Sequence, residues 1–230
     1  MSDTKPELQL AKTINIPSGN VALEGELKVP QGASGIVLFA HGSGSSRHSP
    51  RNQFVARTIQ EASVGTLLFD LLTKEEEAVD AYTAQLRFDI GFLAKRLVDA
   101  TNWITSQTIT QHLRIGYFGS STGAAAALIG AVELPNIVAA VVSRGGRPDL
   151  AGEALPKVKA PTLLIVGGND DVVIGLNEEA YAQLSCEKEL KIVPGATHLF
   201  EEPGTLERVA QLASEWFKAK LQPQVLAQSR

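Results

Sequence analysis

The sequence has little of what several classes of protein require. One cysteine, Cys186, is present in 230 residues, so no internal disulfide can form, and a secreted disulfide scaffold and a cysteine-based zinc site are both excluded. Only four histidines are present. Apolar runs, such as residues 124–129, are far too short to span a bilayer. The first ten residues have no apolar signal core, so we expect a soluble cytoplasmic protein that does not bind a membrane.

Neither sign of charge dominates, since 21 Lys and Arg face 25 Asp and Glu and the formal net charge is -4. This balance lacks the basic footprint of a nucleic-acid-binding protein. Hydrophobic residues make up 44% and charged residues 20%, as in ordinary globular proteins. We expect a single domain over residues 1–230, with loose tails at 1–11 and 222–230. The sequence does not fix the oligomeric state.

Short apolar runs recur along the chain. Residues 13–16 and 21–29 alternate apolar and polar side chains around a turn at 17–20, which predicts an antiparallel pair at a sheet edge. The later runs are continuous, as in parallel strands covered on both faces; they lie at 36–40, 65–69, 113–118, 137–142, 162–166 and 190–193. Helices are predicted between them, at 50–62, 86–106, 121–133, 176–185 and 204–221. The alternation predicts an α/β fold with a mostly parallel sheet.

Residues 71–86 carry no strong strand signal, and we interpret their acidic run as a solvated face.

The run 113–118 is followed by Gly119-Ser120-Ser121-Thr122-Gly123, a G-x-S-x-G pattern centred on Ser121. Such a serine sits on a sharp strand-to-helix turn, and the flanking glycines let neighbouring backbone approach closely. We therefore predict that Ser121 is a nucleophile. Ser120 is the competing serine, but it would point away from the turn. The alternative is a Gly/Ser turn without chemistry.

Two more polar groups follow later strands. Asp170 comes after the run 162–166 and is our candidate for the acid that orients a histidine. Asp171 is the competing residue, and a turn or helix-capping role is the alternative for either. His198 follows the run 190–193 and is the histidine that lies C-terminal to these aspartates. The order Ser121, Asp170, His198, with each residue after a predicted strand, indicates a nucleophile, an acid and a base.

The loop at residues 41–46 follows the first parallel strand and contains two glycines. We expect the oxyanion of the reaction to be bound by the backbone N–H of Thr122 and by one N–H from this loop, that of Ser43, with Gly44 as the alternative. A phosphate-binding role is disfavoured because the loop lacks the lysine of a P-loop and the G-x-G-x-x-G spacing. His41 is interpreted as a structural residue of the loop.

Arginines lie after several strands. Arg144 and Arg147 are expected near the rim of the site, where either could hold a substrate carboxylate with two hydrogen bonds. The alternative is an internal ion pair with Asp149 or Asp70, and Arg47 and Arg51 carry the same two interpretations. About 18 residues separate the strand at 137–142 from Pro161, too few for a large lid. An open site for small or soluble esters is therefore predicted.

These segments together resemble the α/β-hydrolase superfamily, and specifically its dienelactone hydrolase family. The resemblance covers about residues 21–221 and is carried by VLFAHGSGSSRHSPRN, GYFGSSTG, VVSRGGRPDL, LLIVGGNDD and GATHLFEEPG. It implies a mostly parallel sheet of about eight strands with helices on both faces, and an acyl-enzyme mechanism with Ser121, Asp170 and His198. Dienelactone hydrolases proper have a cysteine as the nucleophile at the centre of this strand-to-helix turn. Here that position is Ser121, and Cys186 lies at the end of a predicted helix.

We therefore expect a serine hydrolase that cleaves a small carboxylic ester or lactone, including anionic ones, and that needs no metal or organic cofactor. An acyltransferase or a small peptidase would use the same three residues. A non-catalytic binding module with a hydrolase fold is the alternative from a different class, but it predicts a missing member of the triad, and none is missing.

Overall fold

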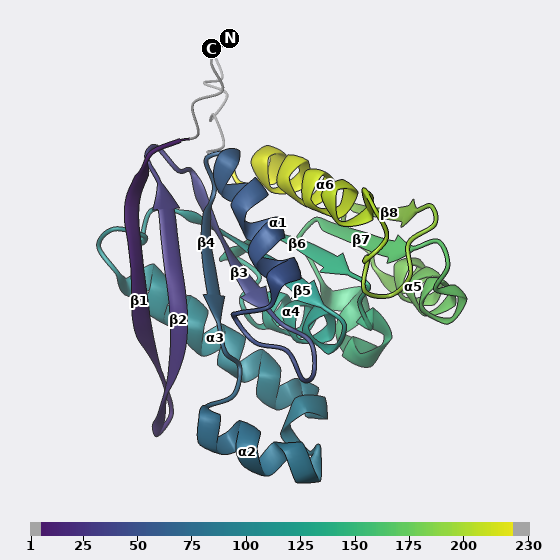
Figure 1. The fold of residues 1–230 in the computed structure, drawn as a ribbon, viewed down its shortest axis with the longest axis horizontal. Coiled ribbons are helices and arrows are strands. Elements are labelled where there is room, and N and C mark those ends of the chain that lie inside the picture. Colours follow the sequence, from purple (N-terminus) through teal and green to yellow (C-terminus); the bar gives the residue numbers. More distant parts are fainter. Residues whose placement is uncertain (1–5, 223–230) are drawn as a thin grey trace.

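The computed structural model describes residues 6–222, which form a sheet of eight strands in the order β1-β2-β4-β3-β5-β6-β7-β8 (Figure 1). The strands are β1 (Leu8–Ser18), β2 (Val21–Pro30), β3 (Gly35–Ala40), β4 (Gly65–Phe69), β5 (Arg114–Ser120), β6 (Val138–Arg144), β7 (Thr162–Gly167) and β8 (Lys188–Val193). Strands β1 and β2 pair antiparallel with each other, β2 pairs antiparallel with β4, and all other pairs are parallel. The predicted mostly parallel sheet with an antiparallel edge is confirmed.

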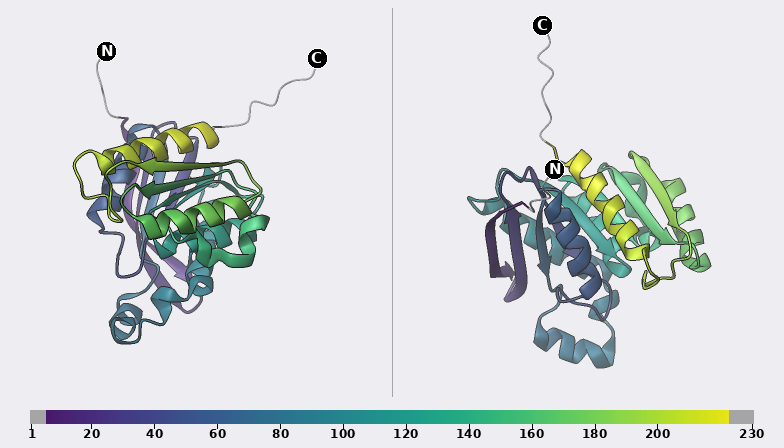
Figure 2. Two further views of the ribbon diagram at one scale, coloured as in Figure 1. Left: turned by 90° about the vertical axis from the view of Figure 1, so that its right-hand side faces the viewer. Right: turned by 45° about the horizontal axis from the view of Figure 1, so that its top comes forward.

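Helices cover both faces of the sheet (Figures 1 and 2). Helix α1 (Pro50–Glu61) packs against α6 (Thr205–Lys220) on one face. On the other face lie α3 (Ile90–Ser106), α4 (Thr122–Glu133) and α5 (Asp171–Gln183), with the 3-10 segment η2 (Pro148–Lys157) between α4 and α5. Helix α2 (Lys74–Thr83) and the 3-10 segment η1 (Leu86–Phe88) project beyond the end of the sheet. No lid domain is inserted within residues 6–222.

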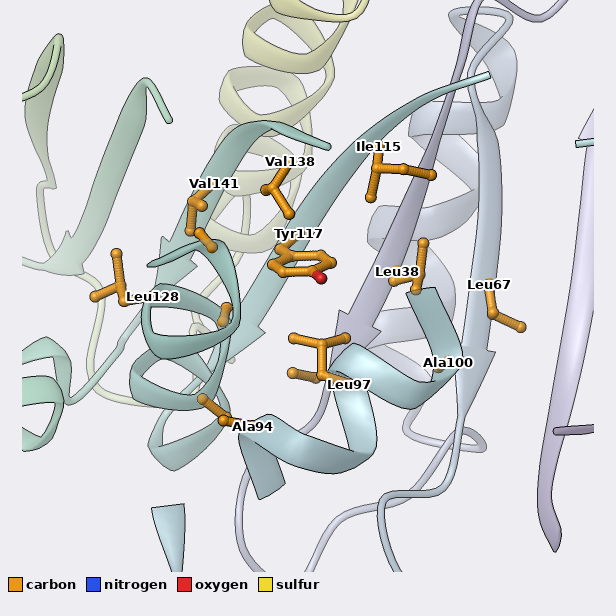
Figure 3. Close-up of a cluster of buried hydrophobic side chains, with 14 of the residues drawn as sticks. Leu38, Leu67, Ala94, Leu97, Ala100, Ile115, Tyr117, Leu128, Val138 and Val141 are labelled. Carbon is orange, nitrogen blue, oxygen red and sulfur yellow. The ribbon is translucent and has the colours of Figure 1, made fainter. Parts of the chain in front are cut away.

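Alternate residues of the central strands supply two cores. Tyr117 of β5 points toward α3, where Leu97 lies beside its ring (Figure 3). An added β-carbon on Gly130 of α4 would lie 3.2 Å from its Cε2, so the ring also faces α4. Its hydroxyl lies 2.6 Å from Oγ1 of Thr101, so the buried phenol has a partner. The next residue, Phe118, faces the α1 and α6 side. The period of two therefore lets one buried strand supply both layers, which is why its sequence is continuously apolar.

The region after β4 differs from the prediction. Residues 74–83 form helix α2 although its acidic run indicated only a solvated segment. Thr73 caps this helix: its side chain accepts from the Glu76 N–H, and the Glu76 carboxylate accepts from the Thr73 N–H. This T-x-x-E capping box is a sequence signal for a helix start. The helix buries only Asp80, so it has almost no apolar face to reveal its period.

Three element boundaries also differ. The helix predicted over 86–106 is divided, because the Asp89 side chain accepts from the Phe92 N–H and starts α3 at Ile90. Helix α5 begins at Asp171, five residues before the predicted start at 176. Residues 8–11 belong to β1 and not to a loose tail. The remaining predicted tails, 1–5 and 223–230, lie outside the described residues.

Candidate active site

A cleft lies at the carboxyl ends of the parallel strands, where α/β sheets bind their ligands. It is lined by residues of the segment 42–51, by Ser120 and Ser121, by Arg144 and Gly145, and by His198 and Leu199. These segments lie at or after the carboxyl ends of β3, β5, β6 and β8. The sheet topology therefore brings together residues that are up to 157 positions apart in the sequence, from Gly42 to Leu199.

Ser121 occupies the turn between β5 and α4 in a strained conformation, with φ 50° and ψ −122°. Non-glycine residues rarely adopt positive φ, and such strain is typical of functional sites. Added β-carbons at the flanking Gly119 and Gly123 would clash with backbone, that of Ala124 in the first case and that of Ala40 in the second. The glycines thus permit the close packing of helix, strand and turn that holds the serine in place.

The Ser121 peptide is also tied to the loop that follows β6. Its N–H donates to the carbonyl oxygen of Arg144 at 3.4 Å, and its carbonyl accepts from the Arg147 N–H at 3.0 Å. The loop between these two residues contains Gly145, which has φ +50°. An added β-carbon there would lie 3.1 Å from the His198 carbonyl oxygen and 3.7 Å from Cε1 of its ring. The loop after β6 therefore touches both Ser121 and His198.

Asp170 and His198 form a direct pair: Nδ1 of His198 lies 2.7 Å from Oδ2 of Asp170. A carboxylate accepts the Nδ1 hydrogen bond, so in the neutral ring Nδ1 carries the proton and Nε2 keeps its lone pair. Within residues 6–222, neither Nε2 of His198 nor the Ser121 hydroxyl has a hydrogen-bond partner, and both residues line the cleft. Asp171 is instead exposed in the first turn of α5.

The loop at 41–46 lies against the start of α4. The Ser43 N–H donates to Oγ1 of Thr122 at 3.1 Å, and the Ser45 N–H closes a turn on the Gly42 carbonyl at 3.1 Å. Thr122 is the first residue of α4, a position whose N–H has no partner within the helix. Gly44 has φ +70°, which glycine tolerates readily.

The His41 side chain holds this loop in place through two hydrogen bonds. Its Nε2 accepts from the Leu71 N–H at 3.0 Å, so Nδ1 carries the proton and donates to the Gly42 carbonyl at 3.0 Å. The ring is buried, and burial lowers its pKa from the ordinary value. His41 thus links the loop after β3 to the loop after β4 as a neutral side chain.

A buried polar group lies beside the nucleophile. Asn52 of α1 accepts at Oδ1 from the Ser120 hydroxyl at 3.3 Å and from Nη2 of Arg144 at 3.4 Å. Ser120, the competing serine, is therefore used in this contact. Asn52 ends the family-like stretch 37–52, but the sequence assigned it no role, because only the packing of α1 on the sheet brings it to the end of β5.

Arg144 lines the cleft with its guanidinium group buried, and its exposed fraction is 7%. No carboxylate within residues 6–222 pairs with it, and its Nε has no hydrogen-bond partner. Burial, and secondarily the charge of Arg51, lowers the pKa of Arg144 to about 10. The ring of Phe200 lies 5.9 Å from its Cζ. A buried cation without a counter-charge is costly, and an anion in the cleft would compensate it.

The other three arginines that the sequence analysis singled out have carboxylate partners. Arg147 binds Asp149 through Nε at 2.9 Å and Nη2 at 2.8 Å, and it does not line the cleft. Arg47 binds both Glu24 and Asp70. Arg51 lines the cleft and pairs with the exposed Glu201 at 2.9 Å. Of the two candidates for holding a substrate carboxylate, the structure brings Arg144 to the nucleophile and pairs Arg147 elsewhere.

Among residues 6–222, His, Cys, Asp and Glu side chains form no group of three that could hold a metal ion. Across the same residues, no helix combines the length and apolar character that crossing a bilayer requires.

The strand order, the strained serine turn and the positions of Asp170 and His198 after later strands define an α/β-hydrolase. The chain belongs to the dienelactone hydrolase family, whose family model matches residues 38–222. A crystal structure of dienelactone hydrolase from Anabaena variabilis ATCC 29413 is 60% identical, with a TM-score of 0.92 over 95% of this chain and 100% of that one.

Two further proteins show how far the similarity extends. A putative phosphoribosyl transferase of Mycobacterium tuberculosis (strain H37Rv) is 57% identical over 204 residues, which are 89% of this chain and 45% of the relative. The chain therefore spans about half the length of that curated relative. Est1E from Butyrivibrio proteoclasticus, in a structure with ferulic acid bound, shares the fold at 16% identity, with a TM-score of 0.76 over 90% of this chain and 99% of that one.

Proposed function

We propose that this chain is a serine hydrolase that cleaves a small carboxylic ester or lactone through an acyl-enzyme. The observation that carries the proposal is the 2.7 Å contact between Asp170 and His198 at the same strand ends as the strained Ser121. Membership of the dienelactone hydrolase family supports it. The single cysteine, Cys186, is half-buried, and its thiol donates a hydrogen bond to Oγ1 of Thr162 at 3.7 Å. Burial raises the pKa of this thiol, which disfavours it as the nucleophile.

In the proposed cycle, Nε2 of His198 takes the proton of the Ser121 hydroxyl while the serine oxygen attacks the substrate carbonyl carbon. The carbonyl π bond breaks, and an oxyanion forms beside the N–H groups at the start of α4 and in the loop 42–44. The imidazolium returns its proton to the leaving alcohol as the ester bond breaks. A water molecule then attacks the acyl-enzyme as His198 takes its proton; the acyl–serine bond breaks, the acid leaves, and His198 returns the proton to the Ser121 oxygen. Asp170 holds the required tautomer throughout.

The free Nε2 and hydroxyl suit this cycle, because catalytic hydrogen bonds are often loose before substrate binds. No metal or organic cofactor enters any of these steps.

The cleft suits a substrate that carries a negative charge near the scissile carbonyl. The support for this is Arg144, which is buried beside Ser121 without a carboxylate partner. A planar guanidinium can hold a carboxylate with two hydrogen bonds. We propose Arg144 and not Arg147 as the substrate-binding arginine, since Arg147 already binds Asp149.

We also propose the cytoplasm as the compartment of this protein. Its single half-buried cysteine is compatible with a reducing compartment.

The name of the mycobacterial relative raises phosphoribosyl transfer as another activity, but more than half of that relative lies outside the matched region. The residues gathered in this cleft are a strained serine and a histidine–aspartate pair, which favour acyl transfer. A non-catalytic hydrolase-fold module, an acyltransferase and a peptidase remain the alternatives to test.

The test is hydrolysis of p-nitrophenyl acetate by the wild type and by Ser121→Ala, with mass spectrometry after treatment with a fluorophosphonate. Activity that disappears in Ser121→Ala, together with one adduct on Ser121, supports the proposal. Ser120→Ala is the matched control and should retain activity and labelling. No turnover and no adduct in the wild type would favour a binding module. Faster p-nitrophenol release with product transfer to an added alcohol or amine would identify an acyltransferase, and cleavage of peptide amides a peptidase.

A further inference from the structure

The Thr122 hydroxyl contacts the group expected as the second oxyanion donor, the Ser43 N–H. Its Oγ1 accepts the Ser43 N–H at 3.1 Å, so in this structure that N–H points at the threonine side chain. Thr122 is buried, with an exposed fraction of 4%, and directly follows the nucleophile. The N–H of Ser43 is therefore already engaged with a hydroxyl oxygen.

A hydroxyl group has one proton as well as two acceptor lone pairs. Within residues 6–222, the Thr122 hydroxyl accepts from Ser43 but has no acceptor for its own proton. A buried donor without an acceptor is uncommon and calls for an explanation. A substrate oxyanion formed at Ser121 would supply that acceptor one residue away.

We propose that the Thr122 side chain, and not only its backbone, binds the oxyanion: the hydroxyl donates to it while accepting the Ser43 N–H. This inference rests on the proposed serine-hydrolase function. The Ser43 N–H polarises the hydroxyl and so strengthens the hydrogen bond that the hydroxyl donates. No proton is transferred to the oxyanion, which reverts to a carbonyl when the leaving group departs. Thr122 thus supplies two donors, its N–H and its hydroxyl, and Ser43 acts through the second.

The competing interpretation is that the hydroxyl only occupies the Ser43 N–H until substrate displaces it. The two interpretations predict opposite effects of Thr122→Val, which replaces the hydroxyl with a methyl group of similar size. If the hydroxyl binds the oxyanion, kcat falls by roughly 10²–10³-fold, the usual effect of losing one such donor, with a small change in KM. If the hydroxyl only masks Ser43, kcat is unchanged or rises because the N–H is freed.

The experiment measures kcat and KM for p-nitrophenyl acetate with wild type, Thr122→Val and Thr122→Ser. Serine keeps the hydroxyl, so Thr122→Ser should restore most of the lost kcat. A second readout is the rate ratio between an ester and the matching thionoester, whose sulfur accepts hydrogen bonds poorly. This ratio should shrink in Thr122→Val, whereas a merely structural effect lowers both rates equally. Thermal unfolding checks that each variant folds.

The outcomes separate this inference from the proposed function. A wild type whose activity does not depend on Ser121 overturns the hydrolase proposal. A Ser121-dependent wild type with a fully active Thr122→Val, or with an unchanged ester-to-thionoester ratio, overturns the role of the hydroxyl alone and assigns the second donor to the backbone of Ser43 or Gly44.

Discussion

Nδ1 of His198 lies 2.7 Å from Oδ2 of Asp170, whereas the adjacent Asp171 extends from the first turn of α5 as an exposed side chain. Two neighbouring carboxylates therefore have separable roles. The Asp170→Asn variant keeps the shape but presents an amide to Nδ1, which disfavours the tautomer with the lone pair on Nε2. We expect kcat for p-nitrophenyl acetate to fall by roughly four orders of magnitude.

Asp171→Asn is the matched control for that experiment. This carboxylate only interacts favourably with the positive N-terminal end of the α5 dipole. The variant should therefore stay within about threefold of the wild-type kcat, with a small loss of thermal stability. Equal effects of the two substitutions would contradict the assignment of Asp170.

A second prediction concerns the charge of Arg144. In Arg144→Met, kcat/KM for the p-nitrophenyl hemisuccinate ester should fall by roughly 10- to 100-fold, the effect of losing a charge-assisted hydrogen bond. Hydrolysis of the neutral acetate should change little. The ratio of the two kcat/KM values, measured at one pH, is the decisive quantity. Arg147→Met serves as the control and should leave the ratio unchanged; a ratio that follows Arg147 instead would refute the assignment.

Asn52 offers an independent test of the same charge, without removing the arginine. In Asn52→Asp, a carboxylate oxygen takes the place of the amide oxygen that lies 3.4 Å from Nη2 of Arg144. An internal counter-charge should then compete with the anionic substrate. We expect the preference for the hemisuccinate over the acetate to decrease by about tenfold or more, with acetate hydrolysis retained. Persistence of the full preference would show that the anion is held elsewhere.

A fourth prediction concerns pH and the buried His41. Burial lowers the pKa of His41, so the folded protein holds the ring neutral while the unfolded chain takes up a proton near pH 6.5. Below that pH the unfolded state binds more protons, and stability is lost as the pH falls. The thermal midpoint of the wild type should therefore drop more between pH 7 and pH 5 than that of His41→Gln. His112→Gln, at an exposed position, should behave like the wild type.

Much of the sheet could be predicted from the sequence because buried parallel strands are recognisable as continuous apolar runs. The strand β4 was predicted with its observed limits, 65–69, since all five of its residues are buried. Helix α2 was missed for the opposite reason: it faces solvent on nearly all sides, and only its capping box marks it. Residues 8–11 were assigned to a tail because most of their side chains are exposed, although their backbone pairs with β2.

The same distinction applies to the candidate site. Ser121, Asp170 and His198 could be proposed because each follows a strand, and strand ends meet at one edge of a parallel sheet. The contacts between side chains could not. The bond from Ser43 to Thr122 joins residues 79 positions apart, and the bond from Arg144 to Asn52 joins residues 92 positions apart. Such bonds depend on how helices pack on the sheet, which no local pattern records.

The attachment of the Ser121 peptide to Arg144 and Arg147 restricts how this protein can diversify. The connection after β6 is where hydrolases of this fold often gain a lid, yet here that connection also supports the nucleophile. An insertion between Arg144 and Arg147 would break the bonds that hold Ser121 in its strained conformation. Evolution toward new substrates is therefore easier along residues 46–51 and around Leu199, which border the cleft without contacting the serine turn or the oxyanion loop.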